Sequence, residues 1–153
     1  MTIVADASVL VAIATDGALG PADASHAAFL AARAGHPVRC TPLARSEALA
    51  AFRRAAWSGA IGEGEEDRLL RNLEALPIDA EWETGDGARA LAIARRMGWA
   101  RTDDAEHCAL AERLGALLLT CDLKLRRSAE QRLDYVVTTS ELVDRLREPP
   151  TMD

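Results

Sequence analysis

The sequence predicts an α/β protein in which helices cover both faces of a parallel sheet. Short apolar runs that fit buried strands alternate along the chain with longer segments that fit helices. With 153 residues, of which 49% are hydrophobic, the chain is long enough to bury a core of its own. We expect one domain over residues 1–146 and a flexible C-terminal tail over residues 147–153.

Five short apolar runs account for the expected sheet. Each is separated from the next by enough chain for a helix, as parallel strands require. The sheet is therefore expected to have its strands at Ile3–Ala5, Val38–Cys40, Leu76–Ile78, Leu117–Thr120 and Tyr135–Val137.

The stretches between the strands fit helices. The clearest start is at Thr41, a good N-cap residue, because Pro42 then takes the first helical position. The glycine-rich stretch "SGAIGEGEEDR" follows a helix and lacks the Lys-Ser/Thr of a phosphate-binding loop, so we interpret it as a hinge between two helices. The expected helices are Ala24–Ala34, Pro42–Trp57, Glu65–Leu73, Gly87–Met97, Ala105–Leu114, Leu123–Gln131 and Ser140–Leu146.

Charge and composition narrow the class of protein. A net charge of −6 argues against a general nucleic-acid coat protein, which is usually basic. The cations are almost all arginines, several in pairs, and either form local phosphate-binding patches or belong to solvated helix faces. The three cysteines form no CxxC pair, which makes a disulfide framework or a zinc site improbable. With no long apolar stretch and no basic leader, a cytoplasmic protein is expected.

Two aspartates follow predicted strands directly. Asp6 interrupts the apolar run "TIVADASVLVAIA", and Asp122 follows "ALLLTC". In open α/β sheets the ligand crevice lies outside the carboxyl ends of the strands, where the strand order reverses. If the two strands are neighbours, the two carboxylates face each other across that crevice. The alternative for Asp6 is a purely structural role as a helix cap.

Glu47 is a third candidate, one turn into the helix that starts after Thr41. Helical spacing places it on a face of small apolar residues, where an unpaired glutamate is uncommon. It therefore either binds a cation or forms an ion pair with Arg54 further along the helix.

The stretch "RTDDAEHCALAERLG" adds a fourth acid. Asp103 stands three residues before Glu106, as in a capping arrangement, so we predict that Asp103 is the N-cap of the helix. Asp104 then shares the small buried face with Cys108 and is the expected functional acid, with Asp103 as the alternative. His107 fits a buried helix residue with a hydrogen-bond partner better than a metal ligand, because the three histidines lack metal-ligand spacing.

Two residues beside the strand-end acids have weaker signals. Ser8 either orients a water near a metal or bonds the first turn of its helix. Cys121 has no histidine or asparagine placed to activate it, so we interpret it as a small buried residue and not as a nucleophile.

Taken together, several stretches resemble the PIN-domain ribonucleases, and in particular the VapC-type toxins of bacterial toxin–antitoxin operons. The resemblance spans almost the whole chain. Glu106 and His107 depart from it, since apolar residues or tyrosine are frequent there, and Asp103 stands where an aromatic or small residue is common. The matching stretches are "IVADASVLVA", "TPLARSEALAAFRR", "ALAIARRMG", "DAEHCALAERLGALLLTCD" and "YVVTTSEL".

The resemblance implies a five-stranded parallel sheet, a homodimer, an RNA substrate such as a tRNA or rRNA loop, and an antitoxin that covers the active site. It also implies supporting roles for Thr120 and, more loosely, Ser8. The acidic quartet of the family falls on the residues already singled out: Asp6, Glu47, Asp104 and Asp122.

Four carboxylates without histidine or cysteine favour Mg²⁺ or Mn²⁺ as the metal. We expect Asp6 and Asp104 to bind it directly, with Glu47 and Asp122 completing the shell. A divalent ion so held supports hydrolysis of RNA phosphodiester bonds, and the main rival is a catalytically silent PIN-like interaction module. The candidate RNA contacts are Arg53, Arg54, Arg101 and Arg126.

Overall fold

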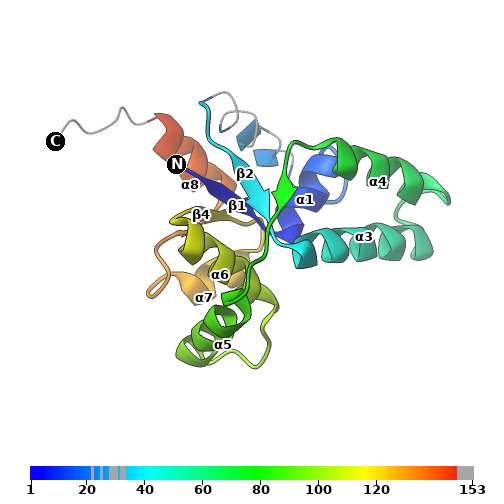
Figure 1. The fold of residues 1–153 in the computed structure, drawn as a ribbon. Coiled ribbons are helices and arrows are strands. Elements are labelled where there is room, and N and C mark those ends of the chain that lie inside the picture. The colour runs from blue at the N-terminus through cyan, green and yellow to red at the C-terminus, as the bar shows by residue number, and fades with distance from the viewer. Residues whose placement is uncertain (22, 25, 28–30, 32–33, 148–153) are drawn as a thin grey trace.

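A five-stranded, all-parallel sheet forms the centre of the computed structural model, which describes residues 1–21, 23–24, 26–27, 31 and 34–147 (Figure 1). The strand order is β3-β2-β1-β4-β5, and each neighbouring pair is parallel. This confirms the predicted α/β class. The strands are β1 (Ile3–Ala5), β2 (Val38–Cys40), β3 (Asp79–Ala80), β4 (Leu117–Leu119) and β5 (Val136–Val137).

Seven helices lie wholly within the described residues and are divided between the two faces of the sheet. Alternating strand residues point to opposite faces, so Ile3 and Ala5 enter one core and Val4 enters the other. The helices on the face of Ile3 are α1 (Ala7–Ala14), α3 (Pro42–Trp57), α4 (Glu65–Ala75) and α8 (Thr139–Arg147). Those on the face of Val4 are α5 (Asp86–Met97), α6 (Asp103–Leu114) and α7 (Leu123–Ala129).

The strand order reverses between β1 and β4, which are hydrogen-bonded neighbours. From this pair the chain builds outward in both directions, through β2 and β3 on one side and through β5 on the other. Asp6 and Asp122 follow these two strands. The prediction that the two strands are neighbours, with both acids after their carboxyl ends, is therefore confirmed.

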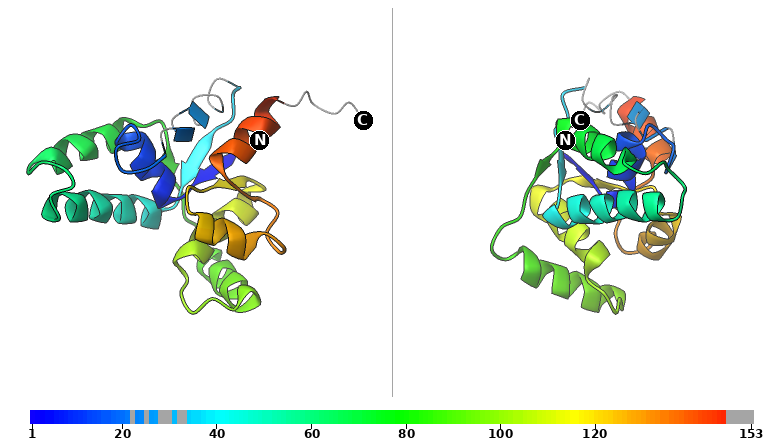
Figure 2. Two further views of the ribbon diagram at one scale, coloured as in Figure 1. Left: turned by 180° about the vertical axis from the view of Figure 1, so that it is seen from behind. Right: turned by 90° about the vertical axis from the view of Figure 1, so that its right-hand side faces the viewer.

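Helices α3 and α4 form an antiparallel pair that projects from the sheet (Figures 1 and 2). The Thr41 hydroxyl caps α3 as predicted, because its Oγ1 accepts a hydrogen bond of 3.0 Å from the backbone N–H of Ala44. Residues 58–64 connect the two helices, and Gly64 takes a positive φ of 84° that favours glycine. The interpretation of the glycine-rich stretch as a hinge between helices is therefore confirmed.

Two predictions about boundaries are wrong in ways that matter for the fold or the site, whereas the bounds of the other predicted elements within the described residues shift by at most two residues. The third strand is β3 and not Leu76–Ile78: Ile78 is buried in the core, and Pro77 has no N–H to donate to a ladder. Helix α6 begins at Asp103 with Thr102 at the N-cap, so Asp103 is not the cap. Arg101 lies beside it and draws its carboxylate into an ion pair instead.

Two other predictions reach beyond the described residues. In the helix expected over Ala24–Ala34, residues 25, 28–30 and 32–33 lie outside them, while Ala24, Ala27 and Ala31 are helical and buried. Arg147 belongs to α8, and the rest of the expected tail, residues 148–153, also lies outside them. None of the helices in the described part of the chain is long and apolar enough to cross a membrane.

Candidate active site

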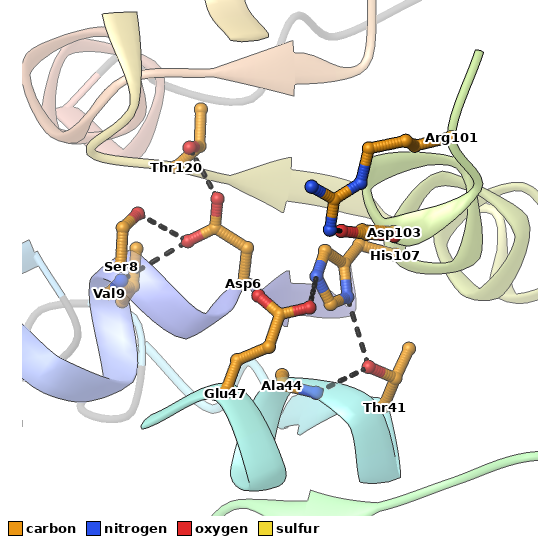
Figure 3. Close-up of polar contacts among 10 residues, drawn as sticks. All are labelled: Asp6, Ser8, Val9, Thr41, Ala44, Glu47, Arg101, Asp103, His107 and Thr120. Carbon is orange, nitrogen blue, oxygen red and sulfur yellow. Dashed lines mark hydrogen bonds and ion pairs between the residues drawn. The ribbon is translucent and has the colours of Figure 1, made fainter. Parts of the chain in front are cut away.

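Asp6 lies at the centre of the site and is held from three sides. It leaves β1 and caps α1, so its Oδ1 accepts the Val9 N–H at 3.1 Å and the Ser8 hydroxyl at 2.5 Å (Figure 3). Its Oδ2 accepts the Thr120 hydroxyl from the end of β4. The two predictions for Asp6 are therefore compatible: it caps α1, and it is also a buried carboxylate at the carboxyl end of β1.

Ser8 and Thr120 tie the two strand ends together around Asp6. Ser8 Oγ also accepts the backbone N–H of Cys121 at 2.9 Å, and Thr120 Oγ1 accepts that of Asp122 at 2.9 Å. The hydroxyls orient the Asp6 carboxylate without neutralising it.

The other three acids approach from three different helices. Glu47 projects from α3, Asp104 from the first turn of α6, and Asp122 from the N-cap of α7. Asp122 Oδ1 accepts the backbone N–H groups of Lys124 at 2.9 Å and Leu125 at 3.3 Å. Among the described residues, no hydrogen bond involves the Asp104 carboxylate, and the buried Glu47 Oε1 has no hydrogen-bond partner.

Electrostatics shows that the acids act on one another. Burial raises the pKa of Asp6, against hydrogen bonds that lower it, and the charge of Asp122 adds to the rise. Burial also raises the pKa values of Asp104 and Glu47. The negative charges of Asp103 and Asp6 raise both values further. A site with uncompensated negative charge at pH 7 is the result.

The donor set fits a hard divalent cation in chemistry and charge. All four side chains offer carboxylate oxygens, and one buried oxygen, Glu47 Oε1, lacks a partner. Among the described residues, however, no three His, Cys, Asp or Glu side chains lie close enough together to hold an ion as they stand. Side chains on separate helices would have to converge to complete a coordination shell.

His107 lies in the core beneath Glu47 and is 2% exposed. Its Nδ1 is 2.9 Å from Thr41 Oγ1, and its Nε2 is 3.9 Å from Glu47 Oε1. Burial lowers the pKa of His107 to about 4, although nearby Asp104 and Asp103 act in the opposite direction. The ring is therefore neutral at pH 7, and the prediction of a buried helix histidine with a hydrogen-bond partner is confirmed. Glu47 pairs with neither Arg54 nor any other arginine among the described residues.

Two adjoining cavities of about 540 Å³ and 490 Å³ open beside the acids; Glu47, Asp104 and Asp122 line them, whereas the buried Asp6 lines neither. They share Glu47, Arg101 and Asp103 as lining residues. The larger also has apolar walls and is bordered by Arg54, whereas the smaller is bordered by Lys124 and contains both Asp104 and Asp122. Together they form a crevice with both polar and apolar walls and with cations at its rim.

The four candidate arginines divide into two groups. Arg54 and Arg101 line the cavities, although Arg101 also pairs with Asp103. Arg53 instead lies over the ring of Trp57 at 5.5 Å, and Arg126 makes two hydrogen bonds to Glu141, at 2.9 Å and 2.8 Å. Neither Arg53 nor Arg126 lines either cavity.

Sequence reasoning overlooked Lys124 and Trp99, which line the smaller cavity. Lys124 is the only lysine and follows Asp122 by two residues, a signal that could have found it. Trp99 had no such signal.

Cys121 is partly exposed and lines the larger cavity, so the expectation of a buried residue is wrong. Burial and the charge of Asp6 nevertheless raise its pKa to about 11, which disfavours a thiolate nucleophile.

Comparison with known proteins agrees with this geometry. The PIN domain model matches residues 3–131, and the chain therefore belongs to the PIN domain family. PIN domains are generally nucleases and typically use divalent metals.

A solved structure with a similar fold is that of PAE2754 from Pyrobaculum aerophilum, with a TM-score of 0.67. The match covers 95% of this chain and 98% of that one at 21% identity, so the likeness concerns the fold alone. No curated protein matches the sequence.

Proposed function

We propose that this protein is a Mg²⁺- or Mn²⁺-dependent endoribonuclease whose active site is formed by Asp6, Glu47, Asp104 and Asp122. One observation carries the proposal: four acids from four elements lie around the strand-order reversal, and among the described residues no arginine or lysine pairs with any of them. A buried acid in a purely structural role is normally paired with a cation, but in the part of the chain that the structure describes Asp6 is buried without one. The three more exposed acids add negative charge around it, so the arrangement calls for a bound cation.

Each acid has a role that suits its surroundings. Asp6, oriented by Ser8 and Thr120, and Asp104 would hold the metal directly. Glu47 and Asp122 would complete the shell, directly or through water. When bound, a divalent ion acidifies a water and offsets charge on the attacked phosphate. Glu47, with its raised pKa, suits the acceptance of a proton from the attacking water, and no covalent enzyme intermediate is needed.

Single-stranded loops of a structured RNA, such as a tRNA or rRNA, are the proposed substrates. The crevice is bordered by Arg54, Arg101 and Lys124 where phosphates would pass. Unpaired nucleotides can be splayed into such a crevice, whereas an A-form duplex cannot. Since few cations border the crevice, cleavage should depend only moderately on salt.

The sequence resemblance to VapC-type toxins extends the proposal to biology. We propose that the protein is a cytoplasmic, homodimeric toxin and that a cognate antitoxin holds it inactive by covering the crevice. Induced expression in a bacterial host should then arrest growth with the wild type and not with Asp6→Asn. Arrest by both proteins would argue against a toxin that acts through its nuclease site.

Cleavage of total RNA by the purified protein tests the activity. We expect discrete fragments with Mg²⁺ or Mn²⁺, and loss of about 10³-fold in rate for Asp6→Asn and Asp104→Asn, as for other electrostatic groups that stabilise a transition state. EDTA should abolish the fragments. Asp79→Asn, a change at an exposed acid on the edge strand β3, is the matched control and should cleave normally.

Intact RNA together with no Mn²⁺ binding by calorimetry would support the rival, a catalytically silent PIN-like interaction module. The wide present spacing of the acids is the observation that favours this rival.

A further inference from the structure

Thr41 and His107 form a buried polar pair beneath Glu47 that the proposed chemistry does not use. Thr41 caps α3 and is fully buried, and His107 reaches it from α6, where its ring lies between Thr41 and Glu47 (Figure 3). Because Glu47 stands on α3 and Asp104 on α6, this pair joins the two helices that carry these acids.

The Thr41 hydroxyl determines which ring nitrogen of His107 carries the proton. Thr41 Oγ1 accepts the Ala44 N–H at 3.0 Å, so its own hydrogen is available for His107 Nδ1 at 2.9 Å. A buried hydroxyl hydrogen without an acceptor is unfavourable, because it has lost its hydrogen bond to water and gained none in the protein. Nδ1 is therefore the acceptor, and in a neutral imidazole the proton lies on Nε2.

The protonated Nε2 faces Glu47. Its distance to Glu47 Oε1, 3.9 Å, is too long for a hydrogen bond. Yet Oε1 is buried and has no partner among the described residues, while the Glu47 side chain as a whole is 37% exposed. One oxygen thus faces the histidine, and the rest of the side chain borders the crevice. Such contacts are often long in an unliganded site and shorten in the working complex.

We propose that His107 is a positioning residue whose Nε2–H, fixed by Thr41, holds one oxygen of Glu47 and directs the other toward Asp6 and Asp104. This inference rests on the proposed function, because it assigns Glu47 to a metal site. The alternative is that His107 only fills the core between α3 and α6.

Two near-isosteric substitutions separate the roles of the two ring nitrogens. In His107→Gln, the amide nitrogen takes the place of Nε2 and still donates to Glu47. In His107→Asn, the amide oxygen takes the place of Nδ1 and accepts from Thr41, but nothing donates to Glu47. His26→Gln, at an exposed histidine, is the matched control.

Mn²⁺ titration by calorimetry is the main readout and does not depend on turnover. We expect His107→Asn to weaken Mn²⁺ binding by about 10- to 100-fold, the usual effect of losing a partner that orients a ligand. His107→Gln should bind close to wild type, although it loses the Thr41 bond. In a Glu47→Gln background, His107→Asn should have no further effect, because the two side chains act as one unit. Urea unfolding in EDTA checks that each variant is folded.

Nitrogen-15 NMR of histidine-labelled protein reads the tautomer directly and should show the Nε2–H form for His107. The Nδ1–H form would overturn the inference, as would equal Mn²⁺ affinity in wild type, His107→Gln and His107→Asn. If the wild type itself binds no Mn²⁺, the proposed function fails and this inference fails with it. If only the variants fail to differ, the proposed function stands.

Discussion

Asp6 and Asp86 are both buried aspartates, yet their surroundings are opposite. Asp86, at the start of α5, accepts a hydrogen bond of 2.9 Å from Arg113 Nε and one of 2.8 Å from the Glu83 N–H. Burial alone would raise its pKa, but these hydrogen bonds and the charge of Arg113 outweigh burial and lower it. Asp6 has no cation beside it among the described residues, and its pKa is raised.

The difference separates an acid that stabilises the fold through an arginine of the chain from acids whose charge requires a bound cation. Arg113 also lies 3.2 Å from Glu81 and 3.3 Å from Glu83, so one guanidinium is shared by three carboxylates and each of them has a cation beside it. The quartet around Asp6 collects negative charge without such a partner. Substitution should therefore cost stability in the Asp86 group, and metal binding and catalysis in the Asp6 group.

The largest effect on stability is expected from Asp86→Ala. It removes the buried carboxylate that accepts hydrogen bonds from Arg113 and from the Glu83 N–H, and hydrogen bonds to a charged group contribute about 1.5–3 kcal/mol each. Urea unfolding in EDTA measures the loss, and RNA cleavage by the folded protein should persist. The control is Asp79→Ala, at a side chain that is 83% exposed, which should stay within about 0.5 kcal/mol of wild type. Equal losses in the two variants would remove the distinction drawn for Asp86.

The next largest effect is the pH dependence that His107 confers. Its pKa is about 4 in the folded protein and near 6.5 in the unfolded chain, so the unfolded state binds the proton first as pH falls. Stability should therefore decrease from pH 6.5 to pH 4 by about 3 kcal/mol relative to His107→Gln. Comparison with the variant is needed because the raised pKa values of Asp6, Glu47 and Asp104 act in the opposite direction. Parallel pH profiles for the two proteins would contradict a buried neutral imidazole.

Metal addition should stabilise the wild type. At a free Mn²⁺ concentration 100 times Kd, the free energy of unfolding should rise by about 2.7 kcal/mol, and EDTA should reverse the change. Asp86→Asn should respond as the wild type does, whereas Asp6→Asn should not respond. A thermal melt with and without Mn²⁺ measures the shift. The same shift in Asp6→Asn would place the metal elsewhere.

The smallest expected effect is an increase in the free energy of unfolding. In EDTA, Asp104→Asn removes one of several repelling charges and should raise the free energy of unfolding by about 1 kcal/mol. The corresponding change in the Asp86 group, Asp86→Asn, should lower it. Chemical unfolding of the two variants side by side tests the contrast. A loss of stability in Asp104→Asn would mean that this acid is paired in the folded state.

Local sequence signals predicted most of the fold, because they report choices made within a few residues. The Thr41–Pro42 pair marks a helix start, since the hydroxyl caps the turn and proline has no N–H to lose. The apolar run at residues 76–78 was wrongly predicted to be a strand, because apolar residues also occur in buried connections between elements. The neighbouring β3 needs only backbone pairing at the sheet edge, so its residues are exposed.

The sequence by itself determined the α/β pattern and the presence of acids after β1 and β4, since both follow from the order of residues along the chain. Only the tertiary structure decided which side chains compensate one another. Arg113 pairs with Asp86, Arg126 pairs with Glu141, and the His107 ring lies between Thr41 and Glu47. Those pairings depend on the distances between helices packed on a common sheet, and spacing along one chain does not encode such distances.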